Sequence, residues 1–209
     1  KNSKIKHFLF SSSSSVYGSS EKKKSKENNN TDFPIQFYAA TKKANELMLH
    51  SYSHQLKLPV TVMRFFTVYG PFGRPDMSIL RFIHWIINEE KVQVFGDGEQ
   101  RRSFTYVKDV VDALLKMSGL EKSHTFNVGS NMTVSLNDVI KLIEEYSGKS
   151  ANIENLERAY KDPDVVRPDL ENIKKIIGWE PTTKIEEGVE KTVAWYKKNE
   201  GYLKDLVYL

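Results

Sequence analysis

A serine run and a tyrosine–lysine pair are the residues of this sequence best suited to chemistry. Five consecutive serines, Ser11 to Ser15, precede Val16-Tyr17-Gly18, and Tyr38 and Lys42 follow at a spacing of four. Residues four apart share one face of a helix, so the Lys42 ammonium can lie close to the phenol. A nearby cation favours the phenolate and lowers the pKa of a phenol from its usual value, near 10. We therefore expect Tyr38, assisted by Lys42, to exchange a proton with an alcohol.

The neighbouring sequence, more than the spacing, supports this interpretation. A Y-x-x-x-K spacing also arises by chance in a sequence this rich in tyrosine and lysine, and Lys43 lies on a different side of the helix. The serines could form a flexible linker, but Phe8-Leu9-Phe10 and Val16-Tyr17-Gly18 are apolar segments that tie down both ends. Small hydroxyl residues after a strand let a ligand approach closely, which favours a binding site.

Hydrophobic patterning predicts the elements that position these residues. Residues 5–10 form a short apolar run typical of a buried strand, residues 19–33 a polar loop, and residues 37–57 a helix. Residues 60–66 are apolar apart from Arg64, as in a parallel strand that is covered on both faces. Strand, helix and strand form a βαβ unit, so we expect the sequence to open inside a doubly wound parallel sheet.

The remaining sequence alternates helices with short strands. Ser135 begins a capping box, Leu136, Val139, Ile140 and Ile143 follow helical periodicity, and Gly148 stops that helix. We expect the other helices over residues 78–90, 107–117, 169–177 and 185–199, strands over 92–95 and 125–128, a turn over 96–98 and an extended piece around residue 104.

Composition excludes several classes of function. The 209 residues carry a net charge of +4 and no cysteine, which excludes disulfides and thiolate metal sites. The basic residues are scattered, and the basic stretch over residues 21–30 reads as a solvated loop, so we expect no nucleic-acid binding. His50 and His54 lie four apart without a convergent carboxylate, which favours a surface or interface over a metal site. No apolar run is long enough to span a membrane, so we expect a soluble, cytoplasmic protein.

Three stretches resemble the extended short-chain dehydrogenase/reductase family of nucleotide-sugar epimerases and dehydratases. They are residues 10–18, 38–48 and 58–77, and the last is the most discriminating because it carries Thr67 and ends in G-R-P-D-M. The resemblance covers essentially the whole sequence. It implies an α/β fold with a partial Rossmann domain, residues 1–72 and 105–130, that lacks its N-terminal strands. A small α+β substrate-binding lobe would comprise residues 73–104 and 131–209.

The resemblance also implies NAD as the cofactor, a UDP-sugar as the substrate and no metal. Ser13 would be the catalytic hydroxyl, Tyr38 the acid/base at the sugar 4-hydroxyl, and Lys42 the residue that holds the nicotinamide ribose. Arg102 and Arg167 would clamp the diphosphate, although on composition alone either arginine reads as a surface ion-pair partner. The implied sets are catalytic Ser13, Tyr38 and Lys42; cofactor-binding Ser11, Ser12, Tyr38, Lys42 and Phe65; and substrate-binding Ser13, Thr67, Arg74, Arg102 and Arg167.

The implied reaction is the 4-epimerisation of UDP-glucuronate to UDP-galacturonate through a 4-keto intermediate. That intermediate is a β-keto acid, and we expect Thr67 and Arg74 to hold its carboxylate so that it does not lose carbon dioxide. Arg167-Pro168-Asp169 also resembles UDP-glucuronate decarboxylases, and a UDP-galactose 4-epimerase is a further alternative. The non-enzymatic alternative is an orphan half-fold that dimerises through the Tyr38-bearing helix. A homodimer through that helix, with Leu47, Met48 and Tyr52 on its contact face, is also implied for the enzyme.

The sequence departs from the family pattern in two places. It contains no G-x-x-G-x-x-G or G-x-G-x-x-G, the turn that normally cradles the cofactor pyrophosphate, and no corresponding first strands. We therefore expect this chain alone to bind NAD weakly or not at all, as calorimetry would measure, and to turn over no substrate. Ser103 stands where many relatives carry Asp, so an interaction that orients Arg102 is expected to be absent or replaced.

Overall fold

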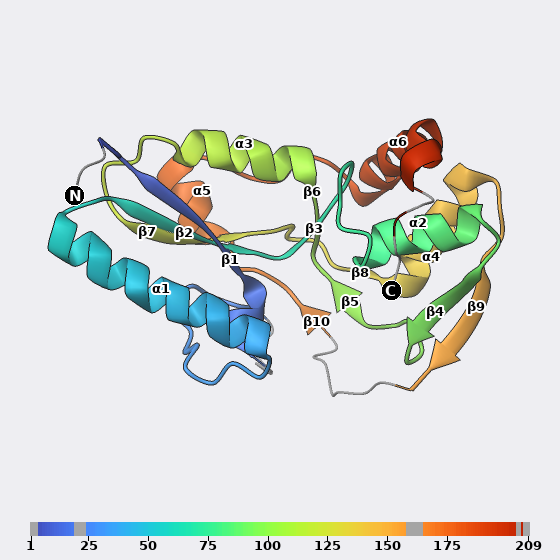
Figure 1. Ribbon diagram of the computed structural model, residues 1–209, viewed down its shortest axis with the longest axis horizontal. Helices are drawn as coiled ribbons and strands as arrows, with labels where there is room; N and C mark the ends of the chain where they lie inside the picture. The colour runs from blue at the N-terminus through green and yellow to red at the C-terminus, as the bar shows by residue number, and fades with distance from the viewer. Residues whose placement is uncertain (1–3, 19–23, 158–164, 204–205, 207–209) are drawn as a thin grey trace.

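The computed structural model describes residues 4–18, 24–157, 165–203 and 206 of the chain (Figure 1). Residues 19–23, the first part of the predicted polar loop and of its basic stretch, lie outside the described residues. The fold is α/β, as predicted, and its helices and parallel strands form two lobes side by side.

The first lobe is built on a three-stranded parallel sheet in the order β1-β2-β7. The strands are β1 (Phe8–Ser13), β2 (Val60–Phe65) and β7 (His124–Val128). Helix α1 (Phe37–Leu56) lies on one side of this sheet, and α3 (Val107–Met117) and α5 (Glu171–Ile177) lie on the other (Figure 1). Residues 60–64 of β2 are all buried because helices cover both faces of the sheet. The predicted βαβ unit is confirmed.

Strand β1 lies three residues further along the chain than predicted. Ser11, Ser12 and Ser13 belong to the strand and pair in register with Met63, Arg64 and Phe65 of β2. The serines were expected to end the strand because their side chains are polar, but the main-chain ladder depends on N–H and C=O groups that every serine also has. The strand therefore carries the serine backbone up to the edge of the site.

The second lobe contains a helical core beside three small sheets. Helices α2 (Ser78–Ile87), α4 (Leu136–Ser147) and α6 (Ile185–Leu203) pack on one another, and Ile83, Ile140 and Val193 are almost completely buried between them. The sheets pair β4 (Lys91–Phe95) with β9 (Asn152–Leu156), β3 (Thr67–Tyr69) with β6 (Phe104–Tyr106), and β5 (Arg101–Arg102) with both β8 (Val134–Ser135) and β10 (Val165–Val166).

The predicted capping of α4 is confirmed. The Ser135 side chain accepts a hydrogen bond from the Asp138 N–H, and Gly148 ends the helix with a left-handed backbone at φ 76°. By contrast, β9 was not predicted, because its sequence Asn152–Leu156 is largely polar; among the described strands it pairs with β4.

The hydrophobic cores divide the chain slightly differently from the expected domains. Ile173 of α5 and Trp179 are fully buried together with Met63, Val110 and Phe126 of the first lobe. The expected division assigns both Ile173 and Trp179, within residues 131–209, to the second lobe. Because burial against the first sheet stabilises this segment, it belongs with the first core. Within the described residues, no helix is both long and apolar enough to cross a bilayer.

Candidate active site

A cavity of about 660 Å³ opens at the carboxyl ends of β1 and β2. Parallel strands bring the residues that follow them to one edge of the sheet, which is where ligands of such folds bind. The first turn of α1 and the segment from Phe65 to Met77 complete the walls. Eight of the residues predicted for the site border this cavity: Ser11, Ser12, Ser13, Tyr38, Lys42, Phe65, Thr67 and Arg74.

Tyr38 and Lys42 lie on one face of α1 and point to the same cavity. The Lys42 Nζ lies 5.6 Å from the centre of the Tyr38 ring and 5.3 Å from the centre of the Phe10 ring. It also donates a 2.9 Å hydrogen bond to the Ser11 carbonyl oxygen. Lys43 instead donates to the Thr31 hydroxyl on another side of the helix. The ammonium is thus fixed between the strand that carries the serines and the helix that carries the phenol.

Ser13 borders the cavity at the end of β1 and begins the short 3₁₀ helix η1 (Ser14–Tyr17). Its Oγ accepts hydrogen bonds from the Ser15 N–H, at 3.2 Å, and from the Ser15 hydroxyl, at 2.9 Å. This hydroxyl therefore has a defined position at the edge of the cavity.

Ser12 does not fit the cofactor-binding role that was expected of its side chain. It is buried, and its hydroxyl donates a 2.6 Å hydrogen bond to Oε1 of Glu46 on α1. Successive side chains of a strand point to opposite faces, so Ser12 faces the helix while its neighbours face away from it. Ser12 ties β1 to α1 and so contributes to the position of the site.

Sequence reasoning missed a buried polar network beneath the cavity. Arg64 of β2 makes two hydrogen bonds to the Glu46 carboxylate, 3.0 Å from Nε and 2.8 Å from Nη2, and a third of 3.1 Å to the Tyr17 hydroxyl. Tyr17 in turn donates to Oδ1 of Asn127 on β7. Burial raises the pKa of Tyr17 to about 12, which keeps this phenol protonated. The polar Arg64 in an otherwise apolar strand was the signal that could have revealed the network.

Thr67 and Arg74 also border the cavity, in the segment after β2. The Arg74 guanidinium forms a two-point ion pair with the Asp76 carboxylate, 3.0 Å from Nε to Oδ1 and 2.5 Å from Nη2 to Oδ2. Both side chains are well exposed to solvent, so the pair is screened by water. The Nη1 group of Arg74 is not part of this two-point contact.

Arg102 and Arg167 do not border this cavity but lie in and next to the sheet formed by β10, β5 and β8. Arg102 of β5 pairs in register with Val166 of β10, the residue that precedes Arg167. The Arg167 Nε is buried and has no hydrogen-bond partner among the described residues. The structure thus brings Arg102 on β5 close to Arg167, 65 positions away in sequence, which directly follows the paired strand β10.

Ser103 connects the two lobes through its hydrogen bonds to Ser130. Its hydroxyl donates to the Ser130 carbonyl oxygen at 2.7 Å and accepts from the Ser130 N–H at 2.9 Å. Ser103 is almost completely buried, so both hydrogen bonds are shielded from water. The serine joins β5 to the loop that follows β7.

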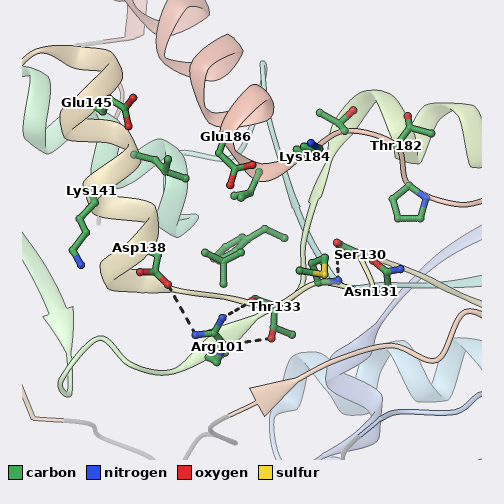
Figure 2. Close-up of a pocket in the computed structure, with 17 residues that line it drawn as sticks. Arg101, Ser130, Asn131, Thr133, Asp138, Lys141, Glu145, Thr182, Lys184 and Glu186 are labelled. Carbon is green, nitrogen blue, oxygen red and sulfur yellow. Dashed lines mark hydrogen bonds and ion pairs between the residues drawn. The ribbon is translucent and has the colours of Figure 1, made fainter.

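A second cavity, of about 740 Å³, lies between α4 and the segment that leads into α6 (Figure 2). Arg101 borders it, and its guanidinium donates to the Thr133 carbonyl and forms an ion pair with Asp138 (Figure 2). Because neighbouring residues of a strand face opposite sides, Arg101 reaches this cavity and Arg102 does not. The residues lining it include none of those predicted for the site. Among the described residues, no cluster of three histidine or acidic side chains could hold a metal ion.

The chain is similar to proteins of known sequence and structure. The model of the NAD dependent epimerase/dehydratase family matches residues 1–129, more than half of the chain. A UDP-glucuronate 4-epimerase of Thermodesulfobacterium geofontis is 44% identical over 179 residues, which make up 84% of this chain and 54% of that protein.

Two crystal structures share the fold across nearly the whole chain. The UDP-glucuronic acid 4-epimerase of Bacillus cereus, in complex with UDP-glucuronic acid and NAD, matches 95% of this chain and 63% of its own, with a TM-score of 0.88 and 30% identity. The UDP-glucose 4-epimerase of Thermotoga maritima, with UDP-glucose, matches 94% of this chain and 65% of its own, with the same TM-score and identity. The chain therefore spans between about half and two thirds of the length of these relatives.

Proposed function

The chain belongs to the NAD-dependent epimerase/dehydratase family, and we propose that the protein carrying it is a UDP-glucuronate 4-epimerase. The observation that carries this proposal is the convergence of Ser13, Tyr38, Lys42, Thr67 and Arg74 on one cavity. The first three suit alcohol chemistry, and the last two supply a hydroxyl and a cation for a carboxylate. The similarity to UDP-glucuronate 4-epimerases of two bacteria supports the same substrate.

We propose NAD as the cofactor, with its nicotinamide ribose held at the Lys42 end of the cavity. The fit is supported by the Lys42 ammonium, which the Ser11 carbonyl fixes between the Phe10 and Tyr38 rings, and by Phe65 at the end of β2. When bound, NAD supplies reversible hydride transfer at the sugar C4 carbon. The residues described here suit only the nicotinamide end, because the sequence has no glycine-rich pyrophosphate turn. Weak or absent binding of NAD by this chain alone stays a prediction.

In this proposal Tyr38 and Ser13 handle the proton of the sugar 4-hydroxyl. The Tyr38 phenolate takes the proton as the alcohol becomes a ketone, and the resulting phenol returns it when the ketone is reduced on the other face. The Ser13 hydroxyl donates a hydrogen bond to the same sugar oxygen. Lys42 places a positive charge beside the phenol ring.

Thr67 and Arg74 would hold the carboxylate of the keto intermediate. A β-keto acid loses carbon dioxide readily when its carboxylate carbon–carbon bond aligns with the carbonyl π system. A hydroxyl and a guanidinium from the same segment can hold that bond out of alignment. Asp76 restrains Arg74 from the Nε and Nη2 side, so the substrate would meet the Nη1 side.

The uridine diphosphate would be bound by the second lobe. We propose that Arg102 on β5 and Arg167, which follows the neighbouring strand β10, form a charge-assisted clamp on the diphosphate. The unpaired Nε of Arg167 supports this role, because a buried donor without a protein partner costs free energy unless a ligand accepts from it.

Two broader features belong to the same proposal. We propose a cofactor domain of residues 1–72 and 105–130, joined by the segment around α5 and Trp179, and a substrate domain formed by the rest. We also propose a homodimer through α1, whose Leu47, Met48 and Tyr52 side chains are each more than half exposed. A cytoplasmic location stays a prediction.

Product analysis on the protein at its full natural length tests the function. UDP-glucuronate with NAD should give UDP-galacturonate. A UDP-pentose product would instead support a UDP-glucuronate decarboxylase. Selective conversion of UDP-galactose to UDP-glucose would support the alternative that the Thermotoga maritima similarity favours. Assembly into dimers without any turnover would support the orphan half-fold.

A further inference from the structure

The Ser13 hydroxyl has its two acceptor positions occupied. A serine hydroxyl has one proton to donate and two lone pairs that accept. One lone pair of Ser13 accepts from the Ser15 N–H and the other from the Ser15 hydroxyl. The remaining hydrogen-bonding capacity of Ser13 is therefore its own proton.

Ser15 is held firmly in the position from which it makes these contacts. It lies in η1, where its carbonyl accepts from the Gly18 N–H at 3.1 Å. Val16 and Tyr17, which follow it, are buried, and the Tyr17 hydroxyl is bound by Asn127 and Arg64. Gly18 adopts φ 62°, and a Cβ there would lie 2.9 Å from the Phe33 carbonyl oxygen. Both features favour glycine at the end of this turn.

We propose that Ser15 is a positioning residue that commits the Ser13 hydroxyl to donating its proton into the cavity. This inference rests on the proposed function. Ser13 then stabilises the sugar oxygen only by donating to it, and it cannot accept the proton that the 4-hydroxyl loses. That proton passes directly to the Tyr38 oxygen, and Ser13 does not relay it.

A double-mutant cycle on the protein at its full natural length tests the proposal. In an otherwise unchanged protein, Ser15→Ala removes one of the two donors to Ser13. We expect kcat to fall about tenfold with KM nearly unchanged. A tenfold change in rate corresponds to roughly 1.4 kcal/mol, the size of one hydrogen bond. In a Ser13→Ala background, Ser15→Ala should produce no further loss. Ser15→Thr, which keeps the hydroxyl, should restore kcat. The matched control is Ser123→Ala, which breaks another serine pair, 2.7 Å from Ser53 and remote from the cavity.

Two results would overturn the inference: an equal loss of kcat in the Ser13→Ala background, or no loss with Ser15→Ala. A wild-type protein that turns over no UDP-glucuronate would contradict the proposed function instead. In that case the coupling is measured by thermal unfolding. The pairing then predicts that the double variant shifts Tm by less than the two single shifts combined, and additive shifts would overturn it.

Discussion

At the scale of single residues, the site depends on one cation beside one phenol and on a buried ion pair below them. Lys42 reaches the Ser11 carbonyl and the Tyr38 ring from the side of α1 that faces the cavity. Glu46, one turn further along, pairs with Arg64 where both side chains are almost completely buried. The Lys42 contacts bear on chemistry. The Glu46–Arg64 pair holds α1, the helix that carries Tyr38 and Lys42.

Replacing Lys42 should impair chemistry far more than replacing its neighbour. Lys42→Met removes the charge beside Tyr38, and because positioned acid–base groups contribute roughly 10²–10⁴-fold to rate, we expect kcat to fall by at least about 10²-fold. Lys43→Met is the matched control, since Lys43 contacts Thr31 and Asp32 outside the cavity. Steady-state kinetics on the two variants measure the difference, and equal losses would contradict the assigned role of Lys42.

Breaking the buried pair should destabilise the protein strongly. Glu46→Gln leaves the Arg64 charge buried beside a neutral amide, and removing one partner of such a pair typically costs about 3–5 kcal/mol. Glu154→Gln breaks the exposed pair with Lys91 and should change the free energy of unfolding by no more than about 1 kcal/mol. Urea unfolding of both variants provides the comparison. A similar small effect for both would show that the network does not hold α1.

Residue types and spacing indicated that Tyr38, Lys42 and the serine run meet, and the family resemblance supplied Phe65, Thr67 and Arg74. Neither predicted what each side chain contacts. Tyr38 and Lys42 could be paired because a helix repeats every 3.6 residues. The partners of Ser12 and Arg64 could not be predicted, because Glu46 reaches both through the packing of α1 on the sheet. The side of the strand on which Ser12 lies depends on the register of β1, which the polar serines concealed.

At the scale of elements, helices carry the strongest sequence signal and short strands the weakest. Helix α3 begins and ends where the periodicity predicts, and α4 begins at its predicted cap. Strands β5, β8 and β10 have only two residues each, too few for any alternation to be recognised. Their pairing is nevertheless what brings Arg102 beside Arg167.

Helices α2 and α6 are joined by a histidine whose charge state should influence stability. His84 is buried, its Nδ1 lies 2.7 Å from the Tyr196 hydroxyl, and its Nε2 faces Glu90 at 3.5 Å. Burial lowers the pKa of His84 below its usual value, with Glu90 opposing the shift. Because the folded pKa lies below the unfolded one, the contribution of His84 is complete above about pH 6.5 and is lost as the pH falls through the folded value.

Acidification from pH 7 to pH 5 should therefore destabilise the wild-type protein more than His84→Gln. Denaturant unfolding at several pH values measures the two slopes. Parallel slopes would mean that His84 is not held neutral between α2 and α6.

The exposed face of α1 leads to a prediction about assembly. Leu47→Glu with Met48→Glu places two charges among the exposed apolar residues of α1. If the proposed dimer forms through this face, we expect the double variant to be a monomer in light scattering. Leu115→Glu on α3, where the leucine is 70% exposed, is the control and should leave the mass unchanged. A dimer that persists in the α1 variant would exclude this face as the interface.

At the scale of the whole molecule, each lobe has its own hydrophobic core, and these cores fix the positions of the parts of the site. The first core places the serines, Tyr38 and Lys42 at one edge of a parallel sheet. Arg102 lies on β5 in the second lobe, whereas Arg167 follows β10, whose Val166 packs on Val16, Tyr17 and Phe66. The doubly wound class could be predicted from the strand–helix–strand pattern. The packing of Trp179 on the first core could not, since its indole N–H finds its partner in the Asp109 carbonyl, 70 positions away.

The fate of a deuterium label at C4 of UDP-glucuronate tests the central claim most directly. Incubated with NAD and the protein at its full natural length, the labelled sugar should yield UDP-galacturonate that keeps deuterium at C4, because hydride leaves and returns without meeting water. Tyr38→Phe should slow this conversion by at least about 10²-fold. Loss of the label to solvent, or unchanged turnover by Tyr38→Phe, would contradict oxidation and reduction at C4 by this site.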